Sequence, residues 1–140
     1  MKLYLDTEFN GHGGDLISIA LAGDDGSTFY AEAPEPRVWN EWVFDNVFPH
    51  LHHKPEEMTL LRFRLREYLR SRGGASIFAD WPADFEHLMR LMTGSSYDES
   101  FMVECTLHLL RGTDPQPETP HNALSDAVAL RDWHNSTLET

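Results

Sequence analysis

The stretch "LYLDTEF" at residues 3–9 places two carboxylates, Asp6 and Glu8, inside a short apolar segment. Its apolar residues predict a β-strand, on which side chains two positions apart point to the same face. Asp6 and Glu8 would then stand side by side, where two negative charges repel each other and lose solvation. A bound cation is the simplest reason for such a pair.

The segments that follow predict a mixed α/β sheet. We expect hairpin-joined strands at 3–9, 16–22 and 28–33, a short strand at 75–80, and a strand or strand-to-helix element at 100–107. Helices are expected at 38–48, from about Pro55 to Arg72, from Pro82 to about Gly94, and at 122–138. Hairpin strands followed by strands that alternate with helices indicate an α/β fold with a mixed sheet.

Length and composition favour an ordinary globular protein. The chain has 140 residues, which suits a single domain over 1–140, and 41% of them are hydrophobic. No apolar run approaches the ~20 residues of a membrane span, and the N-terminus lacks the long apolar core of a signal peptide. The only cysteine is Cys105, so no internal disulfide can form. We therefore expect a cytoplasmic protein without a membrane partner.

The net charge of −12 argues against nonspecific binding to long duplexes, because phosphate binding usually leaves a basic surface. Bound divalent ions would neutralise some carboxylates, however, so an enzyme that holds a few nucleotides at a strand end is not excluded. Five of the eleven basic residues also cluster in one segment, namely Arg62, Arg64, Arg66, Arg70 and Arg72. On a helix, Arg62, Arg66 and Arg70 would share a face that is either solvated or in contact with RNA.

Two further patches carry charged groups where packing alone would not place them. Asp80 closes the strand at 75–80, and Asp84 lies in the first turn of the next helix. His121 stands five residues before Asp126, an offset that rotates a side chain by about 140° within a helix. The two can therefore converge only if His121 precedes the helix, with Asn122 as its N-cap. A fixed carboxylate and a mobile imidazole suit a metal ligand and a general base, respectively.

These motifs resemble those of the DEDDh group of 3′–5′ exonucleases, which have the ribonuclease H-like fold. Within this group, the chain looks closest to the small 3′–5′ exoribonuclease family first described in mycobacteria, which shares the "DTEF" motif (6–9) and the "HNALSDA" motif (121–127). The resemblance spans residue 3 to about 134. It implies a mixed central sheet, with three antiparallel hairpin strands plus parallel strands, flanked by helices.

The second motif of the group is looser in this chain. The usual Asn-spacer-Phe/Tyr-Asp appears as Asp80-Trp-Pro-Ala-Asp84, so either aspartate could serve. We favour Asp84, because Leu88 and Leu91 follow it at the spacing of the family's helix.

The resemblance implies catalysis by two divalent ions. Asp6, Glu8 and Asp126 would hold one ion, Asp6 would bridge to the second, and Asp84 would complete the site. Hard oxygen ligands select Mg²⁺ or Mn²⁺. His121 would deprotonate the attacking water, and the product would be a nucleoside 5′-monophosphate.

The implied substrate is the 3′ end of single-stranded RNA or of a 3′ overhang. Phe9 and Trp81 adjoin the motifs, where each either stacks on a terminal base or packs in the core. Exodeoxyribonucleases of the proofreading or phage type share the motifs, so DNA stays an alternative. A non-catalytic nucleic-acid-binding module of the same fold is a second alternative, although the chain retains all the expected acids and the histidine. Several relatives are homodimers, and we expect a homodimer here.

Overall fold

The five strands form one mixed sheet in the order β3-β2-β1-β4-β5 in a computed structural model that describes residues 1–139. The strands are β1 (Lys2–Phe9), β2 (Leu16–Gly23), β3 (Thr28–Glu32), β4 (Ala75–Ala79) and β5 (Cys105–Leu109). β1, β2 and β3 pair antiparallel, whereas β4 runs parallel to β1 and β5 runs parallel to β4. The prediction of three antiparallel hairpin strands plus parallel strands is confirmed.

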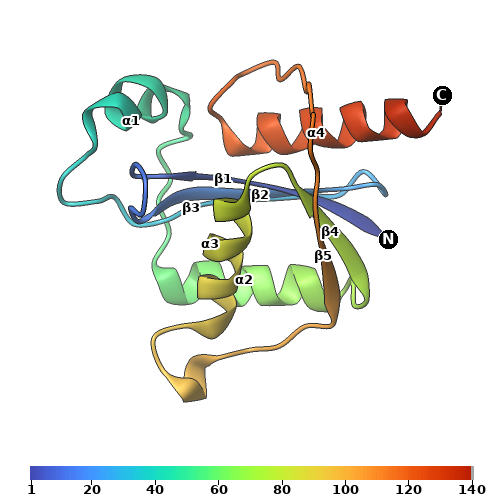
Figure 1. The fold of residues 1–140 in the computed structure, drawn as a ribbon. Helices are drawn as coiled ribbons and strands as arrows, with labels where there is room; N and C mark the ends of the chain where they lie inside the picture. The colour runs from blue at the N-terminus through green and yellow to red at the C-terminus, as the bar shows by residue number, and fades with distance from the viewer. Residues whose placement is uncertain (140) are drawn as a thin grey trace.

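Helices cover both faces of the sheet (Figure 1). α4 (Ala123–Leu138) lies across β1 and β2 on one face, and α2 (Met58–Arg70) and α3 (Pro82–Thr93) lie on the other. Short α1 (Glu41–Asn46) sits beyond the end of the sheet, and single 3₁₀ turns occupy Phe48–His50 and Tyr97–Glu99. This α/β arrangement is consistent with the predicted ribonuclease H-like fold. No helix within residues 1–139 is long and apolar enough to cross a bilayer.

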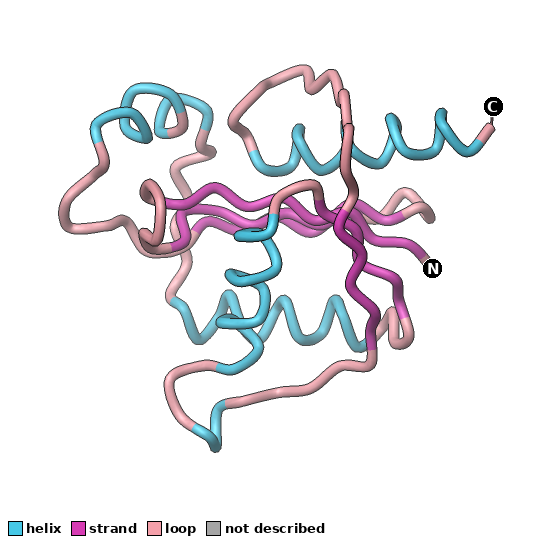
Figure 2. Tube along the Cα trace, viewed as in Figure 1, coloured by secondary structure: helices cyan, strands magenta, loops and turns pink. Residues whose placement is uncertain are grey.

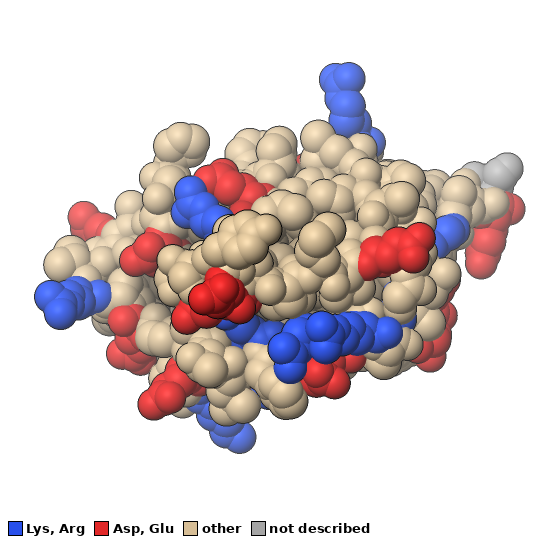
Figure 3. Space-filling view, turned by 90° about the horizontal axis from the view of Figure 1, so that it is seen from below, with Lys and Arg blue, Asp and Glu red and all other residues tan. Residues whose placement is uncertain are grey.

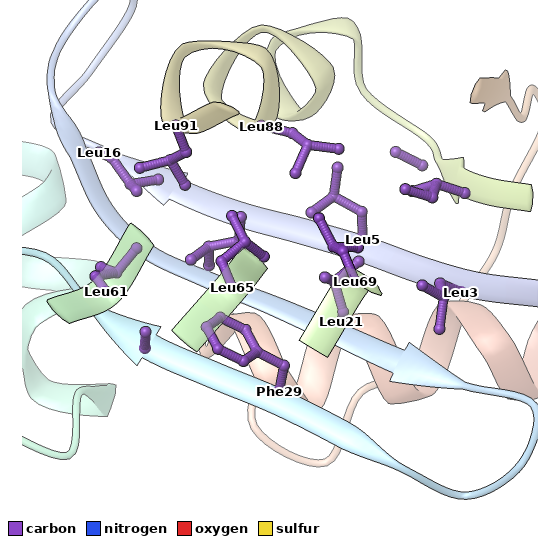
Figure 4. Packing of buried hydrophobic residues seen from close by; sticks show 14 of the residues in the cluster. Leu3, Leu5, Leu16, Leu21, Phe29, Leu61, Leu65, Leu69, Leu88 and Leu91 are labelled. Carbon is purple, nitrogen blue, oxygen red and sulfur yellow. The ribbon is translucent and has the colours of Figure 1, made fainter. Parts of the chain in front are cut away.

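The main hydrophobic core lies between the sheet and the α2–α3 layer (Figure 4). Leucines four residues apart form one face of α2, and leucines from α3 and β1 pack against them: Leu61, Leu65, Leu69, Leu88, Leu91, Leu3 and Leu5. Full burial of one such side chain stabilises the fold by about 1.5–3 kcal/mol. These contacts fix where α3 begins relative to β1.

The opposite face of the sheet carries a smaller core under α4. Tyr4 of β1 and two alanines of β2 meet Ala123, Ala127 and Leu130 there. Because alanine side chains are small, the start of α4 can approach the strands closely. Alternation along β1 sends Leu3 and Leu5 to the main core, and Tyr4, Asp6 and Glu8 to the α4 side.

Three predicted boundaries differ from the observed ones by three residues or more. α1 starts only after Asn40, whose side chain caps it by accepting from the Val43 N–H. α2 starts at Met58 and not at Pro55, because Pro55 forms a bridge with Glu32 at the end of β3. The element expected at 100–107 is a strand, but it begins at Cys105.

Two of the four arginines of α2 connect this helix to other parts of the fold. Arg62 donates to the carbonyls of Leu91 (2.7 Å) and Glu99 (2.6 Å), which ties α2 to the end of α3. Arg64 pairs with Glu56 and lies over the ring of Phe29. On the face of the molecule where α2 and α3 lie, basic side chains form a band with acidic ones beside it (Figure 3). Arg62 is therefore engaged within the protein, whereas Arg66 contacts its neighbours Phe63 and Glu67 on the same helix.

Candidate active site

Five carboxylates converge where β1 and β4 end and α3 and α4 begin. β1 carries Asp6 and Glu8, Asp80 directly follows β4, and Asp84 and Asp126 lie in the first turns of α3 and α4. Because β1 and β4 are parallel neighbours, their carboxyl ends meet at the same edge of the sheet. The loops leading into α3 and α4 lie at that edge (Figure 2).

The carboxylates form two overlapping groups that share Asp6. One group is Asp6, Glu8 and Asp126, and the other is Asp6, Asp80 and Asp84. Within each group, one oxygen from every residue lies within 4.8 Å of the others. The sequence presented Asp80 and Asp84 as alternatives, whereas the structure brings both of them beside Asp6.

The two aspartates of the second group have different hydrogen bonds. Asp84 is only 2% exposed, and its Oδ1 accepts from the hydroxyl (2.6 Å) and the N–H (3.3 Å) of Thr7. Asp80 is half-buried, and its Oδ2 accepts from the Thr113 hydroxyl at 3.0 Å. Sequence reasoning missed Thr7. Its position between Asp6 and Glu8 on β1 places its side chain on the opposite face of the strand, toward α3, and this alternation is the signal that could have identified it.

Burial and mutual repulsion raise the pKa values of these acids. Burial raises the pKa of Asp6 well above its usual range, and the charges of Asp84, Glu8 and Asp126 add to that effect. Burial, followed by the charge of Asp126, raises the pKa of Glu8 to about 9. Burial also raises the pKa of Asp84 to about 7, against the opposing bonds from Thr7. No Lys or Arg in residues 1–139 forms an ion pair with these acids.

Two buried oxygens of the cluster show that its residues fit divalent cations. Asp6 Oδ2 and Asp84 Oδ2 have no hydrogen-bond partner within the described part of the chain. Leaving a buried carboxylate oxygen unpartnered is costly unless the group takes up a proton or binds a cation. The donors are all hard oxygens, which suit Mg²⁺ or Mn²⁺ better than zinc.

His121 precedes α4 as its spacing required. Asn122 caps the helix by accepting from the Ser125 N–H at 3.0 Å, so the predicted N-cap is confirmed. His121 has φ 69°, a left-handed conformation that is uncommon outside glycine. Its ring meets the ring of Trp42 edge-on, with 5.2 Å between centroids. Sequence reasoning counted Trp42 only as an apolar residue of a helix and gave it no role at the site.

A hollow of about 620 Å³ opens beside the cluster. Its lining includes Asp6, Glu8, Phe9, Trp42, Trp81, Asp84 and His121. A larger hollow of about 800 Å³, between residues 33–38 and α3, contains none of these residues, so volume alone does not locate the chemistry.

Phe9 and Trp81 both border the smaller hollow, but they are packed differently. Phe9 is half-buried and stacks on His87 with 4.9 Å between ring centroids. Trp81 is 61% exposed, so the core-packing alternative is wrong for it. An adjoining hollow of about 360 Å³ runs between the two residues and reaches His87. His87 was missed by sequence reasoning, because its position on α3 is also that of an ordinary core residue.

Comparisons with known proteins found relatives that align with part of this chain. No protein-family model matches this sequence. Two curated proteins from two strains of Mycobacterium tuberculosis, each named a 3′–5′ exoribonuclease, are 33% identical to this chain over 97 residues. The aligned region covers 63% of this chain and 58% of each relative. The chain therefore matches less than two thirds of the relatives' length.

We expect Mn²⁺ to stabilise the protein more at about pH 8 than at about pH 5. In the ion-free folded chain, Glu8 has a pKa of about 9 and Asp84 a pKa of about 7, whereas both carboxyls titrate at pH ~4 in the unfolded chain. Between these pH values the two acids therefore hold more protons in the folded chain than in the unfolded chain. The cluster's contribution to stability therefore falls as pH rises, and Mn²⁺ replaces the lost protons. A ligand at 100 times its Kd adds about 2.7 kcal/mol. Thermal unfolding with and without Mn²⁺ measures the difference.

The matched variants are Asp84→Asn, in the cluster, and Asp98→Asn, which is exposed on the turn after α3. Asp84→Asn should lose much of the Mn²⁺-dependent rise in Tm, and Asp98→Asn should keep it. An equal rise at both pH values, or an equal loss in both variants, would contradict a cation site at this cluster.

Proposed function

We propose that this protein is a 3′–5′ exoribonuclease of the DEDDh type, which uses two divalent metal ions and releases nucleoside 5′-monophosphates. The observation that carries the proposal is the pair of carboxylate groups that share Asp6, with His121 beside one of them. The names of the two mycobacterial relatives support the direction of attack and the choice of RNA.

The acids would divide between two Mg²⁺ or Mn²⁺ ions. Asp6, Glu8 and Asp126 would hold one, while Asp6 and Asp84 would hold the other, with Asp80 close enough to assist. When bound, such ions supply positive charge beside the attacked phosphate and make a nearby water more acidic. They would also neutralise a cluster that is otherwise self-repelling.

His121 would act as the general base. Its imidazole would accept a proton from the water that attacks the last phosphodiester. As the water oxygen bonds to phosphorus, the bond to the 3′ oxygen of the preceding nucleotide breaks, and that oxygen keeps the electron pair and gains a proton. The released nucleotide therefore carries a 5′-phosphate. The edge-on contact with Trp42 would hold His121 at the edge of the hollow.

The terminal base would lie between Phe9 and Trp81. Both rings border the hollow beside the acids, and an aromatic ring stacks on any unpaired base. A site that takes an unstacked and unpaired 3′ end suits single-stranded RNA or a 3′ overhang better than a blunt duplex.

We also propose a homodimer. Its contact would involve the sheet edge β5, where Leu107 and Leu109 are exposed.

The direct test is hydrolysis of 5′-labelled RNA and DNA of one sequence, as single strands and with 3′ overhangs. With Mn²⁺ or Mg²⁺ we expect RNA to shorten stepwise from its 3′ end, and excess chelator to stop the reaction. His121→Ala should slow it by about 10²–10⁴-fold, as removal of a general base does, while leaving Mn²⁺ affinity nearly unchanged. His50→Ala is the control, because the exposed His50 side chain lies outside the lining of the hollow.

Hydrolysis that persists in excess chelator would contradict the metal-dependent mechanism. A stronger preference for DNA would make the protein an exodeoxyribonuclease. No hydrolysis of any of these substrates would favour a binding module.

Asp84 and Asp80 should differ in their importance for the rate. Asp84 has a buried oxygen without a hydrogen-bond partner in residues 1–139, whereas Oδ2 of half-buried Asp80 is already bonded to Thr113. We expect Asp84→Asn to cost orders of magnitude in kcat, and Asp80→Asn to cost much less. Single-turnover rates at saturating Mn²⁺ compare the two. The reverse ranking would identify Asp80 as the main acid of the second group.

A further inference from the structure

One polar side chain on α3, that of His87, is buried but has no hydrogen-bond partner. The residue is 5% exposed, and neither ring nitrogen is bonded to another group within residues 1–139. Buried polar groups in proteins are nearly always hydrogen-bonded, so an unbonded imidazole indicates a space beside it that a ligand or solvent can occupy. Neither nitrogen is completely enclosed, so a molecule in an adjoining hollow can reach them.

The ring of His87 stacks on that of Phe9, with 4.9 Å between centroids and 27° between the ring planes. Stacking covers a face of the imidazole, whereas both nitrogens lie in its edge. His87 follows Asp84 by three residues on α3, so the two side chains are neighbours on one face of the helix. The edge of His87 therefore lies near Asp84 and is free to bond a ligand.

His87 borders a hollow next to the one beside the acids. This second hollow, of about 360 Å³, shares Phe9 and Trp81 with the first, and its lining also includes His87 and Arg90. Among the described residues, no carboxylate of the acidic cluster lines it, and His87 does not line the first hollow. A nucleotide with its phosphate at the acids would therefore extend its base, which the ribose separates from the phosphate, into the second hollow.

The second hollow suits a base better than a phosphate. The acidic and basic residues in its lining are Glu86 and Arg90, which pair with each other at 2.6 Å and so leave little net charge to attract an anion. The rings of Phe9 and Trp81 supply the flat apolar contacts on which bases stack. Burial, followed by the charge of Arg90, lowers the pKa of His87, so at neutral pH its ring offers one N–H donor and one acceptor.

We propose that His87 is a specificity-determining residue, which hydrogen-bonds the edge of the 3′-terminal base through a ring nitrogen. Phe9 and Trp81 hold the base by stacking, which any flat ring can provide, whereas the contact with His87 requires polar atoms on the base. The inference rests on the proposed function, because it takes the 3′ end of a nucleic-acid strand as the ligand.

Two RNAs and two protein variants form the test. The RNAs differ only in the 3′-terminal base, which is uracil in one and difluorotoluene in the other, a ring of similar shape that stacks but lacks strong hydrogen-bonding groups. His87→Phe removes both nitrogens and keeps a flat ring that can stack on Phe9. His52→Phe is the matched control, because exposed His52 also contacts an aromatic ring, that of Tyr30 at 4.6 Å, and lines neither hollow.

We expect the wild type to cleave the uracil RNA with a kcat/KM about three- to tenfold higher than that for the difluorotoluene RNA, as the loss of one neutral hydrogen bond predicts. His87→Phe should lower kcat/KM for the uracil RNA by about the same factor and change the value for the difluorotoluene RNA by less than about twofold. His52→Phe should keep both wild-type values.

Binding of the two corresponding nucleoside 5′-monophosphates to the wild type in Mg²⁺ requires no hydrolysis. The uracil nucleotide should bind more tightly by a similar factor, and it alone should shift the imidazole nitrogen NMR signals of His87. This comparison needs no variant, so it holds even where His87→Phe does not fold.

Equal losses for both RNAs in His87→Phe, or equal binding of both nucleotides, would overturn the proposal and leave His87 a purely structural role. A changed ratio of RNA to DNA cleavage with an unchanged base preference would place the contact at the ribose, which also overturns it. If the wild type cleaves no RNA, the proposed exonuclease function fails, and the nucleotide comparison still decides whether His87 contacts the base.

Discussion

Repulsion among the buried and half-buried carboxylates around Asp6 is the constraint on which the rest of the structure depends. β1, the end of β4 and the first turns of α3 and α4 deliver these acids to one place, and no described Lys or Arg pairs with them. Like charges in a poorly solvated site cannot all stay ionised without a counter-charge. The apolar contacts of α2, α3 and β1 hold the arrangement in place despite that cost.

One face of the sheet carries the main hydrophobic core, and the other carries acids of the candidate site. On one face, Leu3 and Leu5 of β1 enter the main core. On the other, Asp6 and Glu8 point toward α4, whose alanines let its first turn, with Asp126, come close to the strands. The outer strand β3 contributes Tyr30 and Glu32 to the same face, where Glu32 accepts from the backbone N–H groups of His52 and Lys54.

The parts of the site that follow from local spacing were predictable from the sequence. Alternation placed Asp6 and Glu8 on one face, and the offset between His121 and Asp126 required a loop followed by a capped helix. The parts that depend on distant contacts were not predictable. Trp42 has the pattern of an ordinary helix residue, and Glu32 has that of a surface charge at a strand end. The bonds from residues 52 and 54 to the Glu32 carboxylate also explain why α2 begins later than Pro55 suggested.

The central claim is that two divalent ions share Asp6, and anomalous diffraction from crystals grown with Mn²⁺ tests it most directly. We expect two peaks, one among Asp6, Glu8 and Asp126 and one between Asp6 and Asp84, with a carboxylate oxygen of Asp6 coordinated to both ions. The currently unpartnered Oδ2 atoms of Asp6 and Asp84 should each lie within coordination distance of an ion. The absence of any peak at this cluster with Mn²⁺ present at millimolar concentration, or peaks confined to other acidic residues, would contradict it.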